Sequence, residues 1–176
     1  MQTTELATRA SAIELLLLDV DGVLTDGGIF YTDAGTEAKR FHVRDGSGLK
    51  LWHAADKRSA IVSGRSSVVV ERRAAELGIR PVLQGRDDKL RAFAEVLAET
   101  GLRAEQVCAI GDDLPDLPVL RRCGLAVAVA DACREVREGA HFVTSAPGGH
   151  GAVRDTVEWL LKLRGEWDAV LARYTN

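Results

Sequence analysis

The sequence is poor in the features that mark several specialised classes of protein. Its 176 residues include only three cysteines, Cys108, Cys123 and Cys133, an odd number with no Cys-x-x-Cys pair. This usage argues against a disulfide framework or a zinc site, and it suits a reducing cytoplasm. The formal net charge is only −3. Such a balance gives no indication of a surface for nucleic acid or for a membrane.

Long apolar runs and low-complexity segments are also lacking. The apolar run that begins at Leu15 breaks at Asp19, which makes it too short for a signal peptide or a membrane span. No internal repeat or proline-rich linker divides the chain. A length of 176 residues with 46% hydrophobic content suits one domain with a good core. We therefore expect a single domain over residues 1–176, with its core at about residues 14–164.

Strand-like and helix-like segments alternate along the chain. The strand candidates are Leu15–Asp19, Ala60–Ser63, Arg80–Leu83, Val107–Ile110, Leu125–Val127 and His141–Val143. The helix candidates are Gly48–Ala55, Val68–Leu77, Asp87–Thr100, Pro115–Arg122 and Val153–Leu163, with a short helix or frayed end after Gly165. This alternation predicts an α/β fold with a Rossmann-like, three-layer parallel sheet.

One segment breaks the alternation directly after the first strand. The β-prone stretches Ile29–Thr32 and Glu37–Val43 flank the turn sequence Asp33-Ala34-Gly35. This pattern predicts a β-hairpin flap at about residues 27–43. Because this segment directly follows the acidic residues at the end of the first strand, we expect the hairpin to stand over the carboxyl edge of the sheet. No insert along the chain is large enough to form a separate cap domain.

Two carboxylates follow the first strand with one residue between them. The apolar run before Asp19 is typical of a strand buried on both faces. Along an extended chain, Asp19 and Asp21 point to the same side, with Val20 opposite. Two buried acids this close are costly unless a metal or a proton lies between them. Their position therefore predicts a functional site at the end of the strand, where the two acids share a metal or a proton.

Three further polar segments also follow strand candidates. They are Ser63-Gly64-Arg65, Gly85 to Lys89, and Gly111-Asp112-Asp113. In a doubly wound sheet these strand ends converge on one crevice. A hydroxyl, a lysine and several acids would then meet, which outlines a site for phosphate and Mg²⁺.

This order of motifs resembles the haloacid dehalogenase superfamily of phosphotransferases. The resemblance implies that Asp19 is a nucleophile forming an aspartyl-phosphate, and that Asp21 is the acid and base. It also implies that Ser63 and Lys89 bind the transferring phosphoryl group. Asp112 would complete a Mg²⁺ site with Asp19 and the backbone carbonyl of Asp21.

A narrower resemblance rests on the hairpin and on the segments Phe41–Gly46, Ser63–Arg65, Gly85–Lys89, Gly111–Asp113, Val127–Ala132 and Gly148–Arg154. From about Leu15 to Leu163, the chain resembles the family of 3-deoxy-D-manno-octulosonate 8-phosphate phosphatases, which act in lipopolysaccharide precursor synthesis. These are cytoplasmic homotetramers in which the hairpin of one subunit helps close a neighbour's site. The family also suggests that the segment from Gly148 serves the tetramer or a neighbouring site. The implied substrate-binding residues are Asp21, His42, Val43, Arg44, Asp45, Gly46, Arg65, Arg73 and Lys89.

Some positions depart from the family pattern. His42 stands where asparagine is common, Lys50 where arginine is frequent, and Ser63 where threonine is commoner. A related phosphatase of nine-carbon keto-deoxy sugar 9-phosphates tends to carry glutamate at the position of Arg65. Arg65 therefore favours the eight-carbon substrate.

Other interpretations are compatible with parts of the pattern. Arg73 alone fits a solvated helix face, and Asp116 fits a supporting role at a helix start better than a direct metal contact. A non-catalytic oligomerisation module is a rival for the whole chain, although such a module has no need for Asp21. A phosphomutase is disfavoured because no cap would shield its intermediate from water.

Overall fold

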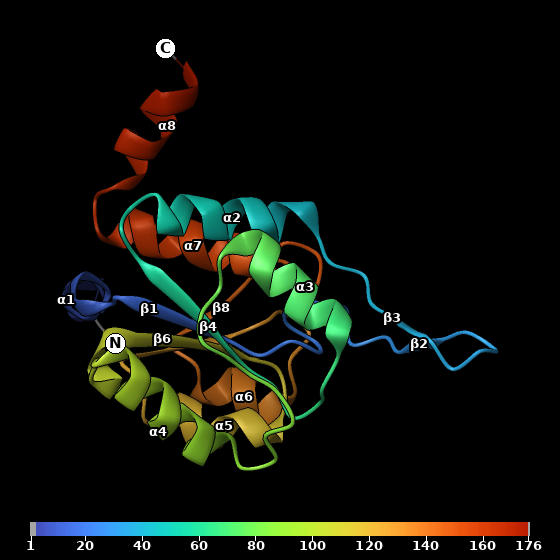
Figure 1. The fold of residues 1–176 in the computed structure, drawn as a ribbon. Helices are drawn as coiled ribbons and strands as arrows, with labels where there is room; N and C mark the ends of the chain where they lie inside the picture. Colours follow the sequence, from blue (N-terminus) through green and yellow to red (C-terminus); the bar gives the residue numbers. More distant parts are fainter. Residues whose placement is uncertain (1–2, 176) are drawn as a thin grey trace.

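The structure is a computed structural model that describes residues 3–175. Its centre is a six-stranded sheet with the strand order β5-β4-β1-β6-β7-β8, in which every neighbouring pair runs parallel (Figure 1). The strands of this sheet are β1 (Leu15–Leu18), β4 (Arg58–Val62), β5 (Val82–Leu83), β6 (Val107–Gly111), β7 (Leu125–Ala128) and β8 (Phe142–Val143). Each lies on a predicted strand, so the predicted α/β architecture is confirmed.

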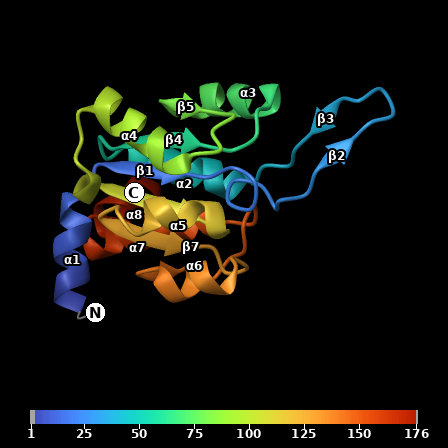
Figure 2. The same cartoon turned by 90° about the horizontal axis from the view of Figure 1, so that it is seen from below.

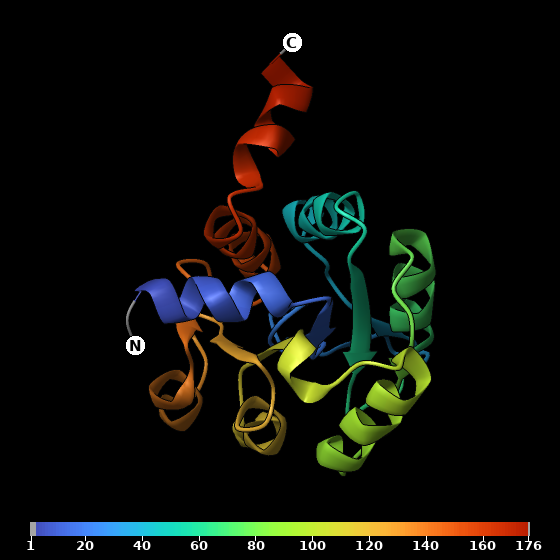
Figure 3. The same ribbon diagram turned by 90° about the vertical axis from the view of Figure 1, so that its left-hand side faces the viewer.

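Helices cover both faces of the sheet, while the last one, α8 (Trp167–Thr175), extends away from the layers beyond α7 (Ala152–Leu163) (Figure 1). The other helices are α1 (Thr3–Ala12), α2 (Val43–His53), α3 (Val68–Leu77), α4 (Lys89–Thr100), α5 (Leu117–Leu120) and α6 (Arg134–Gly139), with short 3-10 turns at Ala104–Gln106 and Leu114–Asp116. Helices α2, α3 and α7 pack on one face, and α4, α5 and α6 on the other (Figures 1 and 3). The result is the three-layer arrangement expected from the sequence.

The central strands are apolar throughout because both of their faces are covered. All four residues of β1 and all four of β7 are buried. Leu15, Leu16 and Leu18 are fully inaccessible to solvent. This burial explains why β1 appears in the sequence as a continuous apolar run rather than an alternating one.

The strand order reverses direction at β1. From there the chain runs outward through β4 and β5, and then returns to the other side of β1 through β6, β7 and β8. The carboxyl ends of β1 and β6 therefore flank a topological switch point, where open α/β sheets bind their ligands. Asp19 and Asp112 directly follow these two strands.

The hairpin projects from the carboxyl edge, away from the layered body (Figures 1 and 2). Its strands β2 (Phe30–Tyr31) and β3 (Glu37–Ala38) pair antiparallel. The predicted second strand, Glu37–Val43, is too long, because Val43 already begins α2. Within residues 3–175 no separate cap domain accompanies the hairpin.

Helix α2 starts five residues earlier than the predicted Gly48. His42 caps its first turn by accepting a hydrogen bond from the amide of Arg44 at its Nδ1. The sequence pattern also missed α1 and α6. No helix in residues 3–175 is both long enough and apolar enough to cross a membrane.

Candidate active site

A cleft of about 370 Å³ opens at the carboxyl edge of the sheet. It collects side chains from the loops after β1, β4, β5 and β6. Its lining consists of Asp19, Asp21, Ser63, Gly64, Arg65, Arg86, Asp87, Lys89, Asp112, Asp113, Pro115 and Asp116. The four segments that the sequence analysis singled out thus meet in one place.

Lys89 lies at the floor of this cleft, at the first position of α4. Its Nζ is 2.9 Å from Asp19 Oδ1 and 2.6 Å from Asp116 Oδ1. Burial alone would lower the pKa of Lys89, but the charges of Asp19 and Asp116 outweigh that effect and raise it. The side chain is therefore a fixed cation beside the carboxylate of Asp19, as the phosphoryl-transfer role requires.

Asp116 holds Lys89 and the start of the loop after β6 in place. Its Oδ2 accepts hydrogen bonds from the amides of Asp112 and Asp113 at 3.0 and 3.3 Å, while Oδ1 faces Lys89. Gly111 makes this possible, since a Cβ there would lie 2.6 Å from the Asp116 side chain. Both oxygens of Asp116 are thus committed to positioning its neighbours.

A second close approach brings the loop after β1 against Asp112. Gly22 has φ +90°, and a Cβ at that position would lie 2.1 Å from Asp112 Oδ2. Both facts require glycine here. The Asp-x-Asp-Gly motif therefore places its glycine, as well as its first acid, Asp19, beside the carboxylate that follows β6.

The clustered carboxylates fit a divalent cation. Asp19, Asp112 and Asp116 each offer an oxygen, and these oxygens lie within 4.8 Å of one another. Carboxylate oxygens are the preferred ligands of hard cations such as Mg²⁺. Because Asp116 is committed to Lys89 and two amides, Asp19 and Asp112 are the side chains free to hold such an ion.

The close packing of these buried carboxylates raises their pKa values. Burial raises the pKa of Asp19 to about 6, although Lys89 opposes the shift. Burial and the neighbouring charges of Asp19 and Asp116 raise the pKa of Asp112 to about 7. A bound cation relieves this repulsion, because it stabilises the ionised form of both groups.

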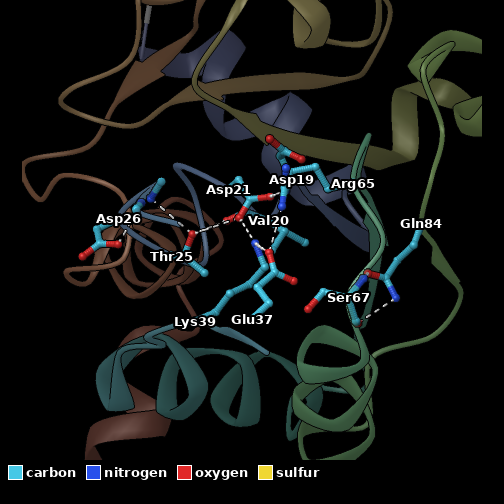
Figure 4. A network of polar contacts seen from close by, with 12 residues as sticks. Asp19, Val20, Asp21, Thr25, Asp26, Glu37, Lys39, Arg65, Ser67 and Gln84 are labelled. Carbon is cyan, nitrogen blue, oxygen red and sulfur yellow. Dashed lines mark hydrogen bonds and ion pairs between the residues drawn. The ribbon is translucent and has the colours of Figure 1, made fainter. Parts of the chain in front are cut away.

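Asp21 points away from this cluster towards the base of the hairpin (Figure 4). Its Oδ1 pairs with Lys39 Nζ and lies 3.5 Å from Thr25 Oγ1. Its Oδ2 lies 3.6 Å from Arg65 Nε. Asp19 and Asp21 therefore do not point the same way, contrary to the prediction from alternation along an extended chain, because β1 ends at Leu18 and the chain turns directly afterwards. Their carboxylates have different neighbours.

Further polar groups line the rim of the cleft. Ser63 is buried directly after β4, and its backbone amide donates a hydrogen bond to the carbonyl of Leu83 at 2.9 Å. Arg65 is 42% exposed, and Arg86 is 41% exposed while pairing with Glu95 at 3.0 Å. A hydroxyl and two partly exposed cations thus line the space where an anionic ligand would lie.

The remaining predicted binding residues lie outside the cleft lining. Val43 and Arg44 are exposed on the first turn of α2, while Asp45 is buried there. Arg73, on α3, packs over the ring of Phe41 and pairs with Glu76. Contact of the segment His42–Gly46 and of Arg73 with substrate stays a prediction.

The glycine-rich segment after β8 packs on the loop that follows β1. The amide of Gly149 donates to the carbonyl of Val23 at 2.9 Å, and a Cβ on Gly148 would lie 1.7 Å from the carbonyl oxygen of Gly22. This segment therefore supports the loop of Asp21 within the same chain.

Sequence reasoning missed the contribution of the hairpin to the site. Glu37 and Lys39 both reach back to the cleft, where they contact Arg65 and Asp21. Part of the signal was present, because residues two apart on an extended chain point to the same side, which puts the charges of Glu37 and Lys39 on one face. The alternation does not determine whether that face turns towards Asp21.

Comparison with known proteins agrees with this geometry. Residues 81–154 match the family described as haloacid dehalogenase-like hydrolase. Over 166 residues the chain is 44% identical to the 3-deoxy-D-manno-octulosonate 8-phosphate phosphatase KdsC of Salmonella typhi, covering 94% of this chain and 88% of that one. The chain belongs to this phosphatase family.

Solved structures of the family superpose closely on the chain. A probable YrbI family phosphatase from Pseudomonas syringae has a TM-score of 0.95 at 48% identity, covering 98% of each chain. The 3-deoxy-D-manno-octulosonate 8-phosphate phosphatase of Moraxella catarrhalis also has a TM-score of 0.95, at 41% identity, covering 99% of this chain and 100% of that one. That structure is a complex with magnesium ion, phosphate ion and KDO. The haloacid dehalogenase resemblance and the fold that it implied are thus confirmed.

Proposed function

We propose that this protein is a Mg²⁺-dependent phosphatase that hydrolyses 3-deoxy-D-manno-octulosonate 8-phosphate to the free sugar acid and phosphate. The observation that carries the proposal is the contact between Lys89 and Asp19 at 2.9 Å, in a cleft shared with Asp21 and Asp112. The family relationship supplies the substrate, and the Moraxella catarrhalis structure, which is a complex with magnesium ion, phosphate ion and KDO, supports it.

In the first half-reaction, a carboxylate oxygen of Asp19 attacks the phosphorus atom. The bond between phosphorus and the sugar oxygen breaks, and its electron pair stays on that oxygen. Asp21 gives its proton to the leaving oxygen, so the sugar departs as a neutral alcohol. Lys89 and Ser63 bind the phosphoryl oxygens, where negative charge is concentrated.

In the second half-reaction, water attacks the phosphorus atom of the aspartyl-phosphate. Asp21, now ionised, takes a proton from that water. The bond to Asp19 breaks, and Asp19 recovers its carboxylate as phosphate leaves. When bound by Asp19, Asp112 and the carbonyl of Asp21, Mg²⁺ screens the repulsion between carboxylate and phosphate.

A substrate that carries both a phosphate and a carboxylate needs cations at two places. Lys89 serves the phosphate at the floor of the cleft, and Arg65 at the rim presents a guanidinium to the sugar acid. Arg86 lies nearby with a similar exposure. We extend the binding site to His42, Val43, Arg44, Asp45, Gly46 and Arg73 on the family resemblance alone.

A panel of sugar phosphates tests the substrate assignment. Purified protein with Mg²⁺ is expected to give a higher kcat/KM with the eight-carbon 8-phosphate than with a nine-carbon keto-deoxy sugar 9-phosphate. A preference for the nine-carbon ester would overturn the substrate but leave the mechanism. Failure to hydrolyse every ester would favour the non-catalytic module.

The proposal includes a cytoplasmic homotetramer in which a neighbour's hairpin helps close each site. Support comes from the exposed apolar residues Ile29, Phe30 and Tyr31, which are 45%, 58% and 64% accessible on the projecting hairpin. The three free cysteines suit a reducing compartment. Light scattering is expected to give four times the chain mass, and Phe30→Ser to weaken that assembly; a monomeric native protein would refute it.

A further inference from the structure

Lys39 is an unusual lysine because its side chain is only 1% exposed although it stands on a projecting hairpin. Its ammonium group pairs with Asp21 Oδ1 and lies 3.4 Å from Glu37 Oε1. Taking an ammonium group out of water is unfavourable unless partners of opposite charge compensate for it. The two carboxylates provide this compensation, and one of them is the proposed acid and base.

These contacts belong to a closed ring of four alternating charges (Figure 4). Lys39 joins Asp21 to Glu37, and Arg65 joins Glu37 back to Asp21, at 2.9 Å from Glu37 Oε1 and 3.6 Å from Asp21 Oδ2. Tyr31 adds a hydrogen-bond contact with Arg65 at 3.1 Å. The hairpin is thereby fastened to the cleft through the residues that the mechanism uses.

The ring treats the two oxygens of Asp21 differently. Oδ1 is held by Lys39, with Thr25 Oγ1 at 3.5 Å on the same atom. Thr25 is itself fully buried. Oδ2 faces Arg65 beyond hydrogen-bond distance. One oxygen is thus anchored, and the other remains available to exchange a proton with the leaving group or with water.

We propose that Lys39 is a positioning residue for Asp21, which it holds by Oδ1 so that Oδ2 is aimed at the oxygen of the leaving sugar. This inference rests on the proposed function and deepens it. Lys39 is not among the residues that line the cleft, so we assign it no contact with the phosphoryl group or the sugar, and in this proposal it acts only through the proton transfer. In that step the proton moves from Asp21 to the sugar oxygen as its bond to phosphorus breaks.

The test compares two phosphate esters that differ in their need for a proton. The sugar phosphate expels an alkoxide-like oxygen, which must be protonated, whereas p-nitrophenyl phosphate expels a stable anion. General acid–base catalysis contributes about 10²–10⁴-fold to a rate. We expect Lys39→Met to lower kcat/KM for the sugar phosphate by about 10–100-fold, a part of that contribution, and to leave kcat/KM for the aryl ester nearly unchanged.

Two controls separate this role from a structural one. Lys57→Met removes a comparable ammonium group, 12% exposed and 2.8 Å from Glu14, far from the cleft, and should leave both esters unaffected. Lys39→Arg keeps a cation at the hairpin and should recover part of the lost activity on the sugar phosphate. Should Lys39→Met fail to fold, Lys39→Arg decides the question: we expect a smaller loss that is still confined to the sugar phosphate, and an equal effect on both esters would overturn the role.

The outcomes are distinct. Equal losses on both esters, or no loss on the sugar phosphate, would overturn the role of Lys39. If the wild-type enzyme does not hydrolyse the eight-carbon ester, the proposed substrate fails instead. The comparison is then made with the best alkyl phosphate of the panel, and a selective loss there still supports Lys39 as the positioning residue.

Discussion

At the scale of single residues, Gly22 shows how closely the site is packed. We expect Gly22→Ala to abolish most phosphatase activity, because a Cβ at φ +90° would collide with Asp112 Oδ2 at 2.1 Å. Steady-state phosphate release checks this. Gly101→Ala is the matched control, since Gly101 also has positive φ (+69°) but would meet nothing within 4 Å. That variant should lose about 1–2 kcal/mol of stability and keep its activity; equal activity losses would contradict the account.

A second prediction at this scale concerns how the stability of the protein depends on pH through the crowded carboxylates. The pKa values of Asp19 and Asp112 are raised to about 6 and about 7 in the metal-free fold. The folded state then binds protons more tightly than the unfolded chain. The contribution of these groups to stability is therefore fully present at acid pH and is lost as pH rises towards 7.

Asp112→Asn isolates this effect from other titrating groups. His53 and His141, whose pKa values are lowered by burial, oppose the trend but are shared by both proteins. Without metal, the Tm of the variant should exceed that of the wild type more at pH 8 than at pH 5. Added Mg²⁺ should raise the wild-type Tm most at pH 8 and have little effect on the variant. A Tm difference independent of pH would contradict the repulsion.

At the scale of secondary structure elements, Asp45 joins two helices. It is 1% exposed on the first turn of α2, and its oxygens accept hydrogen bonds from the amides of Gly151 and Arg154 at 3.2 and 3.0 Å. It therefore caps the N-terminus of α7. We expect Asp45→Ala to cost about 2 kcal/mol, a fall in Tm of roughly 4–8 °C.

Thermal unfolding checks this prediction, with the exposed Asp33→Asn as control. An unchanged Tm in Asp45→Ala would refute the capping role. If kcat/KM measured well below the Tm also falls, substrate contact by this segment gains support independent of stability.

Three helices, α3, α2 and α1, show which helix boundaries a sequence pattern can predict and which it cannot. Helix α3 begins and ends where its apolar spacing and Gly78 predict. The start of α2 was missed because its first turn buries a carboxylate whose partners lie more than 100 residues further along the chain. Helix α1 was missed because its composition is weakly amphipathic and its packing against α7 is a tertiary effect.

At the scale of the whole molecule, topology carries most of the predictable function. Apolar strands, each followed by polar residues, were enough to bring Asp19, Ser63, Lys89 and Asp112 to one edge, because parallel strands share a carboxyl end. The hairpin contacts were not predictable in this way. Lys39 contacts Asp21 because the chain bends back towards the cleft after β3. The alternation of side chains along a strand does not determine such a bend.

The proposed reaction depends above all on Asp19, which acts as the nucleophile on the eight-carbon sugar phosphate. The most direct measurement is phosphate release from 3-deoxy-D-manno-octulosonate 8-phosphate with Mg²⁺, by the native protein and by Asp19→Asn. Asparagine keeps the size of the side chain but removes the attacking carboxylate. We predict clear turnover by the native protein and an almost complete loss in the variant, with its fold retained. Comparable turnover by both proteins would contradict the account.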